Sequence, residues 1–131
     1  MNLLIHPMTI HYPIAFYFLE LLLLLIWAAK NDPIYLRFAS FIFKVGFIGM
    51  IAAIAAGLYD VGGFEHIQGR VKTHFIWALS VLGIQTLRAI FWKVGKPEQG
   101  HYRATQILFS LAGFILITIT AYFGGLLVYG N

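Results

Sequence analysis

Residues 6–30 have the sequence HPMTIHYPIAFYFLELLLLLIWAAK, and this stretch decides the fold. Two histidines and two prolines stand at its start, and the long apolar run behind them contains a single charged residue, Glu20, before Lys30. A helix needs about 20 mainly apolar residues to cross the hydrocarbon core of a bilayer. The stretch therefore predicts a membrane-spanning helix with histidines near one end.

The composition of the whole chain supports a membrane protein. Of the 131 residues, 60% are hydrophobic and 11% are charged, and the mean hydropathy is +0.82. Soluble domains are about one-quarter charged, and a chain of this length cannot bury so much apolar surface within itself. The net charge of +4 comes largely from cations between apolar runs, which favours lipid headgroups and not nucleic acid as the partner. The lack of cysteine excludes disulfides and thiolate metal sites.

Four apolar runs predict one all-α domain, residues 1–131, folded as an up-down bundle of four transmembrane helices. The turn Asn31-Asp32-Pro33 makes the first two helices antiparallel neighbours. The first run lacks a basic region and a small-residue cleavage site, so we expect it to be retained and not removed as a signal peptide. The predicted helices cover about 8–29, 34–58, 73–94 and 103–129.

The distribution of cations predicts the orientation in a bacterial inner membrane. Arg70 and Lys72 lie towards one side, and the other seven of the nine cations lie towards the opposite side. Because cytoplasmic loops carry the excess of Lys and Arg, both termini and the loop 60–73 are expected outside the cytoplasm. The seven cations predicted on or towards the cytoplasmic side are Lys30, Arg37, Lys44, Arg88, Lys93, Lys96 and Arg103.

Two histidines fall within predicted membrane helices, where an unpaired polar ring is disfavoured. His11 is about one turn inside the first helix, and His74 begins the third. Imidazole is a strong ligand for haem iron and for other transition metals. We therefore predict one haem b held between His11 and His74 near the outer face. The simpler alternative is a hydrogen bond from each ring to Asp60 or to a backbone carbonyl.

Other residues could complete this site. Arg70 and Lys72 are expected to pair with the haem propionates. Small residues four apart in the second helix would let a flat ring or another helix approach closely; they are Gly49, Ala53 and Gly57. His6 is either a further ligand or a helix cap. A non-haem metal is the alternative to haem, and its candidate ligands are His6, His11, Asp60 and His74.

Two charges are predicted at similar depth in the membrane, Glu20 in the first helix and Lys44 in the second. Each lies on the order of 15 Å from a membrane surface at 1.5 Å per residue. Intramembrane charges are usually paired, which predicts a Glu20–Lys44 ion pair. Glu20 follows His11 by nine positions and so lies on the opposite helix face, which places the pair outward, towards a partner subunit. Arg88 is expected to reach the headgroups and is given no role.

Several of these motifs together resemble a bacterial family of predicted four-helix membrane proteins of unknown function, over nearly the whole chain. The architecture is also similar to that of small cytochromes b, whose bundles hold haem through histidines on different helices. That second resemblance implies electron transfer, and a single haem, because only His101 lies on the cytoplasmic side. The motifs that carry the first resemblance are His6-Pro7, His11-Tyr12-Pro13-Ile14-Ala15, Gly57-Leu58-Tyr59-Asp60 and His74.

The function predicted from the sequence is that of an electron-transfer subunit, passing electrons between quinone or an external donor and other subunits of a redox complex. We expect no catalysis by the chain alone, because no nucleophile–base pair is recognisable. One alternative is a cofactor-free structural subunit of a larger membrane complex. Another is a metal or proton pathway through the histidines and Glu20, although the polar residues of the later helices look scattered: Gln85, Thr86, Gln106, Thr118 and Thr120.

Overall fold

The computed structural model describes residues 5–98 and 100–130, and within them the chain is all-helical. Four helical segments are long and apolar enough to cross a membrane, so the predicted four-span helical bundle is confirmed. The observed helices extend a few residues beyond most of the predicted bounds. They are α1 (Ile5–Thr9), α2 (His11–Lys30), α3 (Pro33–Val61), the short 3-10 helix η1 (Phe64–His66), α4 (Gly69–Val94) and α5 (Gly100–Tyr129).

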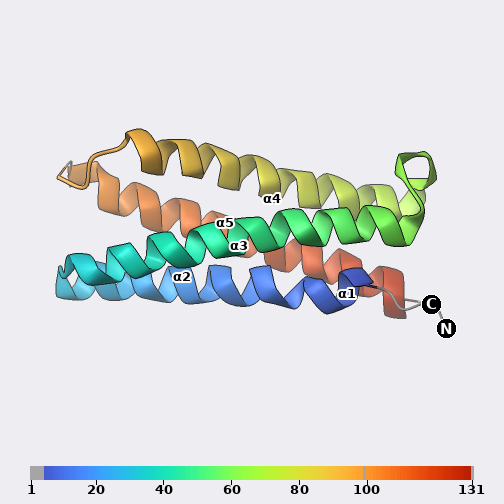
Figure 1. The fold of residues 1–131 in the computed structure, drawn as a ribbon, viewed down its shortest axis with the longest axis horizontal. Coiled ribbons are helices and arrows are strands. Elements are labelled where there is room, and N and C mark those ends of the chain that lie inside the picture. The colour runs from blue at the N-terminus through green and yellow to red at the C-terminus, as the bar shows by residue number, and fades with distance from the viewer. Residues whose placement is uncertain (1–4, 99, 131) are drawn as a thin grey trace.

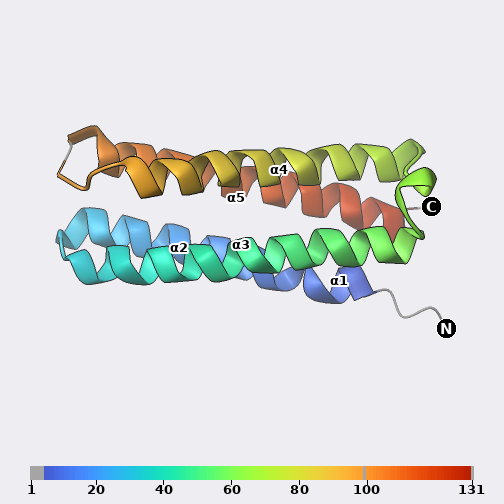
Figure 2. The ribbon, with the colours of Figure 1, turned by 45° about the horizontal axis from the view of Figure 1, so that its top comes forward.

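The four long helices run alternately up and down (Figure 1). Helix α2 packs against α3 and α5, and α4 packs mainly against α5, so α2 and α4 lie on the diagonal of the bundle (Figure 2). Helix α1, η1 and the end of α5 gather at one end, which we name the η1 end. The connections 31–32 and 95–98 lie at the other end, which we name the hairpin end.

Local chemistry explains the tight hairpin between α2 and α3. Asn31 closes α2 in the left-handed conformation, with φ 55°, and its N–H donates to the Trp27 carbonyl at 2.8 Å. Asp32 then caps α3, because its Oδ1 accepts the N–H of Ile34 at 2.9 Å. Pro33 occupies the first helical turn, where its missing N–H matters least.

The helical hydrogen-bond pattern is interrupted at Ile10, but its backbone keeps helical angles (φ −66°, ψ −24°), so α1 and α2 form one span, Ile5–Lys30. Pro13 has no N–H to donate to the carbonyl of Thr9, so one helical hydrogen bond cannot form there. The His6 carbonyl accepts two hydrogen bonds, from the Thr9 hydroxyl at 3.0 Å and from the Ile10 N–H at 3.1 Å. The short helix α1 packs on α3, and this contact directs His6 into the bundle.

Each long helix buries residues at alternating spacings of three and four, the pattern of a left-handed bundle seam. The outward faces carry large exposed apolar side chains, such as Phe41 at 62% and Leu108 at 64% exposure, as lipid contact requires. Apart from the tyrosines, six of the residues buried in the seams are polar or charged, one from α2, two from α4 and three from α5: Glu20, Gln85, Arg88, Gln106, Ser110 and Thr120.

Candidate functional site

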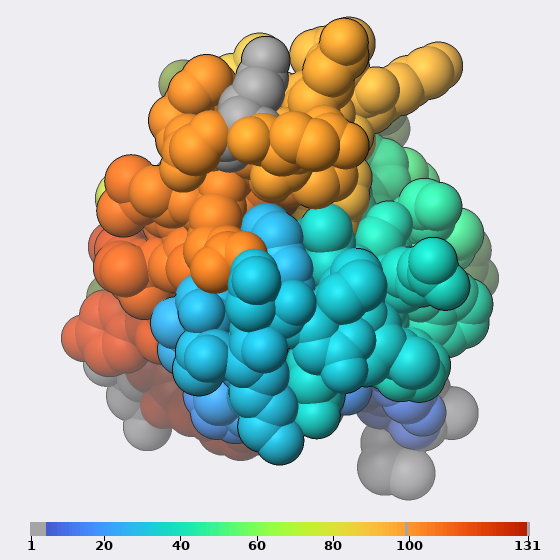
Figure 3. All heavy atoms as spheres, turned by 90° about the vertical axis from the view of Figure 1, so that its left-hand side faces the viewer, coloured from blue at the N-terminus to red at the C-terminus, as the bar shows by residue number. Residues whose placement is uncertain are grey.

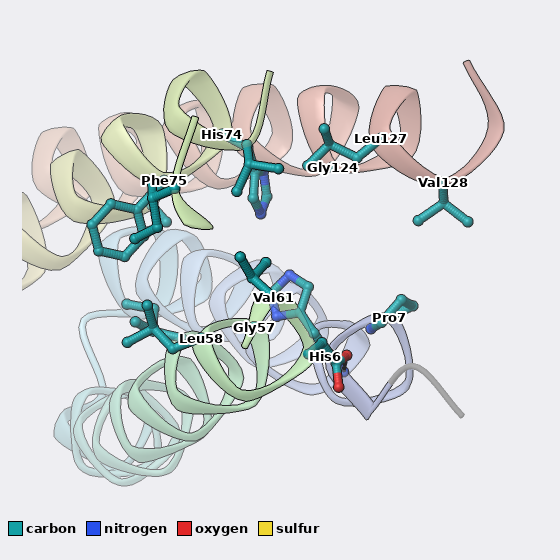
Figure 4. A pocket seen from close by; sticks show the side chains of 15 residues that line it. His6, Pro7, Gly57, Leu58, Val61, His74, Phe75, Gly124, Leu127 and Val128 are labelled. Atoms are coloured by element: carbon teal, nitrogen blue, oxygen red, sulfur yellow. Dashed lines mark hydrogen bonds between the residues drawn. The ribbon is translucent and has the colours of Figure 1, made fainter. Parts of the chain in front are cut away.

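The candidate site lies at the η1 end and is built on two histidine rings that face each other. His6 comes from α1 and His74 from the second turn of α4. Their ring centroids are 5.5 Å apart and their planes are inclined by 75°. Figure 4 shows the two side chains pointing towards one another from opposite helix pairs.

Each ring is held by a backbone carbonyl of a neighbouring helix. The Nδ1 atom of His6 lies 2.6 Å from the carbonyl oxygen of Ala53, and the Nδ1 atom of His74 lies 3.0 Å from that of Thr120. A carbonyl oxygen only accepts hydrogen bonds, so Nδ1 must be the donor in both rings. In the neutral tautomer this leaves the lone pair on Nε2. Metal-binding histidines are commonly oriented by such a bond from the other ring nitrogen.

The Gly-x-x-Asp motif at the end of α3 supports His6 in two ways. A Cβ atom at Gly57 would stand 3.1 Å from His6 Nδ1, so only glycine leaves the ring this room without a shift. The Asp60 carboxylate accepts the backbone N–H of His6 at 2.8 Å and anchors α1. Gly124 of α5 leaves room for the His74 ring in the same way, because a Cβ atom added at Gly124 would stand 3.0 Å from that ring.

A mainly apolar cavity of about 330 Å³ opens beside the two rings. Its wall includes both histidines, Gly57, Asp60 and Gly124 (Figure 4). A second, small cavity of about 20 Å³ touches the same rings from the side of the bundle centre. The histidine pair therefore lies between a larger cavity towards the η1 end and a smaller cavity towards the centre of the bundle.

The structure does not bring His11 to His74. His11 is exposed at the start of α2, and His6 takes the place predicted for it. We correct the predicted partner of His74 accordingly: the packing face of the first helix runs through His6 and not through His11. The two remaining histidines, His66 and His101, are exposed.

Of the other predicted site residues, some are exposed at the η1 end and others pack between helices. Arg70 and Lys72 are exposed at the η1 end, where Arg70 Nη1 donates to the Gly130 carbonyl at 3.5 Å. Gly49 packs against Pro13 of α2, so the small-residue stripe serves helix packing there and the histidine only at Ala53 and Gly57. Within residues 5–98 and 100–130, no group of three or more His, Cys, Asp or Glu is placed to hold a metal ion.

A buried ion pair occupies the middle of the bundle. The guanidinium of Arg88 binds the carboxylate of Glu20 through two nitrogens, and both residues are 0% exposed. Ser110 Oγ donates to Glu20 Oε2 at 2.7 Å, and Arg88 Nε donates to Gln106 Oε1 at 3.2 Å. The predicted outward Glu20–Lys44 pair is therefore wrong, as is the predicted exposure of Arg88. Lys44 is exposed on the outer face of α3.

The helix register explains why Glu20 pairs with Arg88 inside the bundle. Glu20 follows His6 by fourteen positions, and Arg88 follows His74 by fourteen. Fourteen residues are four turns of a 3.5-residue seam and about 21 Å of helix, so the ion pair lies directly inward of the histidine pair.

Sequence reasoning missed the polar contribution of α4 and α5. Gln85 and Gln106 are buried, and both side-chain polar atoms of Gln85 lack a hydrogen-bond partner among the described residues. Arg88 lies over the rings of Phe43 and Trp92, at 4.7 and 4.9 Å from their centroids. The available signal was the three-and-four spacing that these polar residues share with buried apolar ones, as in Tyr102, Gln106, Ser110, Gly113, Ile117 and Thr120.

The fold and site define a multi-pass membrane protein, a four-helix bundle with a histidine pair at one end and an ion pair at its centre. The chain belongs to the family described as "Predicted membrane protein (DUF2231)", whose model matches residues 3–131. This finding confirms the family resemblance drawn from the motifs. No curated protein matches the chain, and no solved structure does.

Proposed function

We propose that the chain is a b-type cytochrome-like electron-transfer protein with one haem, ligated by His6 and His74 at the η1 end. The observation that carries this proposal is the facing pair of imidazoles. Each ring uses Nδ1 on a backbone carbonyl, and each has Nε2 left for a metal.

The spacing of the rings suits two axial ligands on one metal. Bonds from imidazole nitrogen to a metal are about 2 Å long, so two ligands in line have their nitrogens roughly 4 Å apart. The ring centres then lie somewhat farther apart. The observed centroid separation of 5.5 Å is somewhat shorter than the roughly 6 Å that this arrangement needs, so the rings would have to move apart by less than about 1 Å to hold a metal.

The surroundings suit a flat apolar group. The cavity of about 330 Å³ on one side and the small cavity on the other would give a macrocycle room beside the rings. Gly57 and Gly124 keep side chains away from the ligands. A bound haem supplies a one-electron couple whose potential depends on ligands, hydrogen bonds and burial. Ala53 and Thr120 would set the first hydrogen bonds, and Arg70 and Lys72 would pair with propionates at the aqueous edge.

A single haem is favoured by what lies inward of the histidines. The equivalent positions one layer deeper on α2 and α4 carry Glu20 and Arg88, and their ion pair fills the centre of the bundle. The proposed location is the bacterial inner membrane with the η1 end outside the cytoplasm. The electron partners would be quinone or an external donor, and other subunits of a redox complex.

A reduced-minus-oxidised absorption spectrum tests the proposal. Protein purified from cells supplied with haem is expected to show Soret and α bands. The bands should disappear in His6→Ala and in His74→Ala and persist in His11→Ala, the matched control on the same segment. A wild-type protein without these bands would contradict the haem. Bands lost in His11→Ala but kept in His6→Ala would contradict the assignment of the ligands.

A cofactor-free structural subunit is the second candidate. It is favoured by the same hydrogen bonds, because Nδ1 of each histidine is already satisfied by a carbonyl. In that case the purified protein has no pigment, and His6→Ala lowers only the thermal stability of the bundle or of the complex it joins.

A further inference from the structure

A second open site lies at the hairpin end, between α3 and α4. There α3 packs mainly on α2 and α4 mainly on α5, which leaves a groove of about 380 Å³ between the two pairs. Figure 3 looks onto this end of the molecule. The groove is lined by Ser40, Phe43, Lys44, Ala89, Trp92 and Lys93.

The groove combines an aromatic wall with two cations. Lys44 and Lys93 are both exposed, and no acidic residue is among those that line the groove in the described part of the chain. The Phe43 and Trp92 rings pack together at 5.3 Å between centroids with their planes inclined by 33°, and Arg88 lies against both rings from inside the bundle. The wall is therefore fixed by the central ion pair.

The two lysines approach the groove from different depths, Lys93 from the end of α4 and Lys44 from further inside α3. Lys93 is the last residue but one of α4 and follows Arg88 by five positions, about 7.5 Å of helix. Lys44 follows Phe43, whose ring contacts Arg88, and so begins deeper in the membrane. Its long stem lets the ammonium group rise along the groove towards Lys93. A cation at this depth is unfavourable in lipid unless an anion lies beside it.

We propose that this groove binds an anionic phospholipid. The phosphate lies between Lys44 and Lys93, with the Ser40 hydroxyl as an added donor, and an acyl chain lies along Phe43, Ala89 and Trp92. Basic pockets between transmembrane helices bind anionic lipid headgroups in this way. The site is separate from the histidine pair and does not depend on haem binding.

Native mass spectrometry of the detergent-purified full chain tests this proposal. The protein is incubated with dioleoyl phosphatidylglycerol or with dioleoyl phosphatidylcholine, and the fraction that retains one lipid is measured. We expect retention of the anionic lipid, and about 25-fold weaker binding of it by Lys44→Gln/Lys93→Gln, since each cation contributes about a factor of five. Arg37→Gln/Lys96→Gln is the control, with the same loss of charge on exposed residues outside the groove.

A second variant tests the shape of the groove without changing its charge. Ala89→Phe should fill the groove and lower retention, while Ile90→Phe on the exposed neighbouring position should not. Equal retention of the two lipids, or unchanged retention in both groove variants, overturns the proposal. Displacement of the lipid by millimolar inorganic phosphate would also overturn it, because the site would then recognise phosphate without needing the acyl chain.

Discussion

The two histidine rings depend on a pair of glycines that face them. Gly57 on α3 and Gly124 on α5 each leave space that a single methyl group would occupy. Such close contacts are rare for a real Cβ atom, so an alanine at either position has to displace a ring that is also held by a carbonyl hydrogen bond. The glycines thus fix where the imidazoles can stand.

Neighbouring glycines in α5 make a matched test of this contact. In Gly124→Ala the new methyl group meets His74, and we expect a loss of stability of about 1–3 kcal/mol from overpacking. In Gly125→Ala it meets nothing within 4 Å, and the better helix propensity of alanine should stabilise by about 0.5–1 kcal/mol. Unfolding of the detergent-solubilised protein by SDS, followed by tryptophan fluorescence, measures both. Equal effects of the two substitutions would contradict the contact with His74.

At the scale of whole helices, the ion pair joins two helices whose backbones do not approach each other closely. Among the described residues, α2 and α4 make no backbone contact, yet Glu20 and Arg88 meet across the diagonal. These two buried charges fix the position of α2 along α4, because a shift of either helix along its axis would separate them. Buried pairs of this kind specify an arrangement more than they stabilise it.

Single and double substitutions at this pair should differ in a characteristic way. Glu20→Leu leaves Arg88 buried without its carboxylate, and we expect a loss of about 3–5 kcal/mol in the free energy of unfolding. The double variant Glu20→Leu/Arg88→Met leaves no unpaired charge and should lose less than Glu20→Leu alone. SDS titration again gives the comparison.

The control for this prediction is Lys44→Met, because the sequence alone pairs Glu20 with Lys44. Lys44 is exposed and lies outside the polar network, so its replacement should change stability by less than about 0.5 kcal/mol. A loss in Lys44→Met comparable to that in Glu20→Leu would contradict the observed pairing.

The helix register explains which parts of the site could be predicted. His74, Ala53 and Gly57 were recognisable because a histidine and small residues stand out in apolar helices. The choice of His11 was wrong because the helical wheel was anchored on it, which turned Glu20 outward. Anchored on His6, the spacing 6, 10, 13, 17, 20, 24, 27 leads through Glu20 to Trp27. Nothing in one helix alone tells which of two histidines faces its neighbours.

For the whole molecule, the number of spans and the bundle could be predicted, since runs of 20 or more apolar residues form membrane-spanning helices. The partner of Glu20 could not be predicted, because Arg88 lies sixty-eight positions away and the pairing depends on which helices are diagonal. The side of the membrane that each end faces stays a prediction from the count of cations.

The absence of cysteine from the chain makes that orientation directly testable. Single cysteines can be placed at two exposed acidic positions, Glu65 in η1 and Glu98 in the connection before α5. If the η1 end is outside, a membrane-impermeant maleimide added to bacterial spheroplasts should label Glu65→Cys at once. Glu98→Cys should be labelled only after the membrane is permeabilised. The reverse pattern would show that the bundle is inverted, against the positive-inside count.

The attachment of His6 to α3 has a consequence for the order in which the protein is built. His6 is held in its place by Ala53 and Asp60 of α3, because its ring and its backbone N–H both bond to that helix. Because α1 leaves the ribosome before α3, His6 cannot be seated until the second span is in the membrane, and it meets His74 only when α4 arrives. The histidine pair therefore forms only at a late stage of biogenesis, after both α3 and α4 have been inserted.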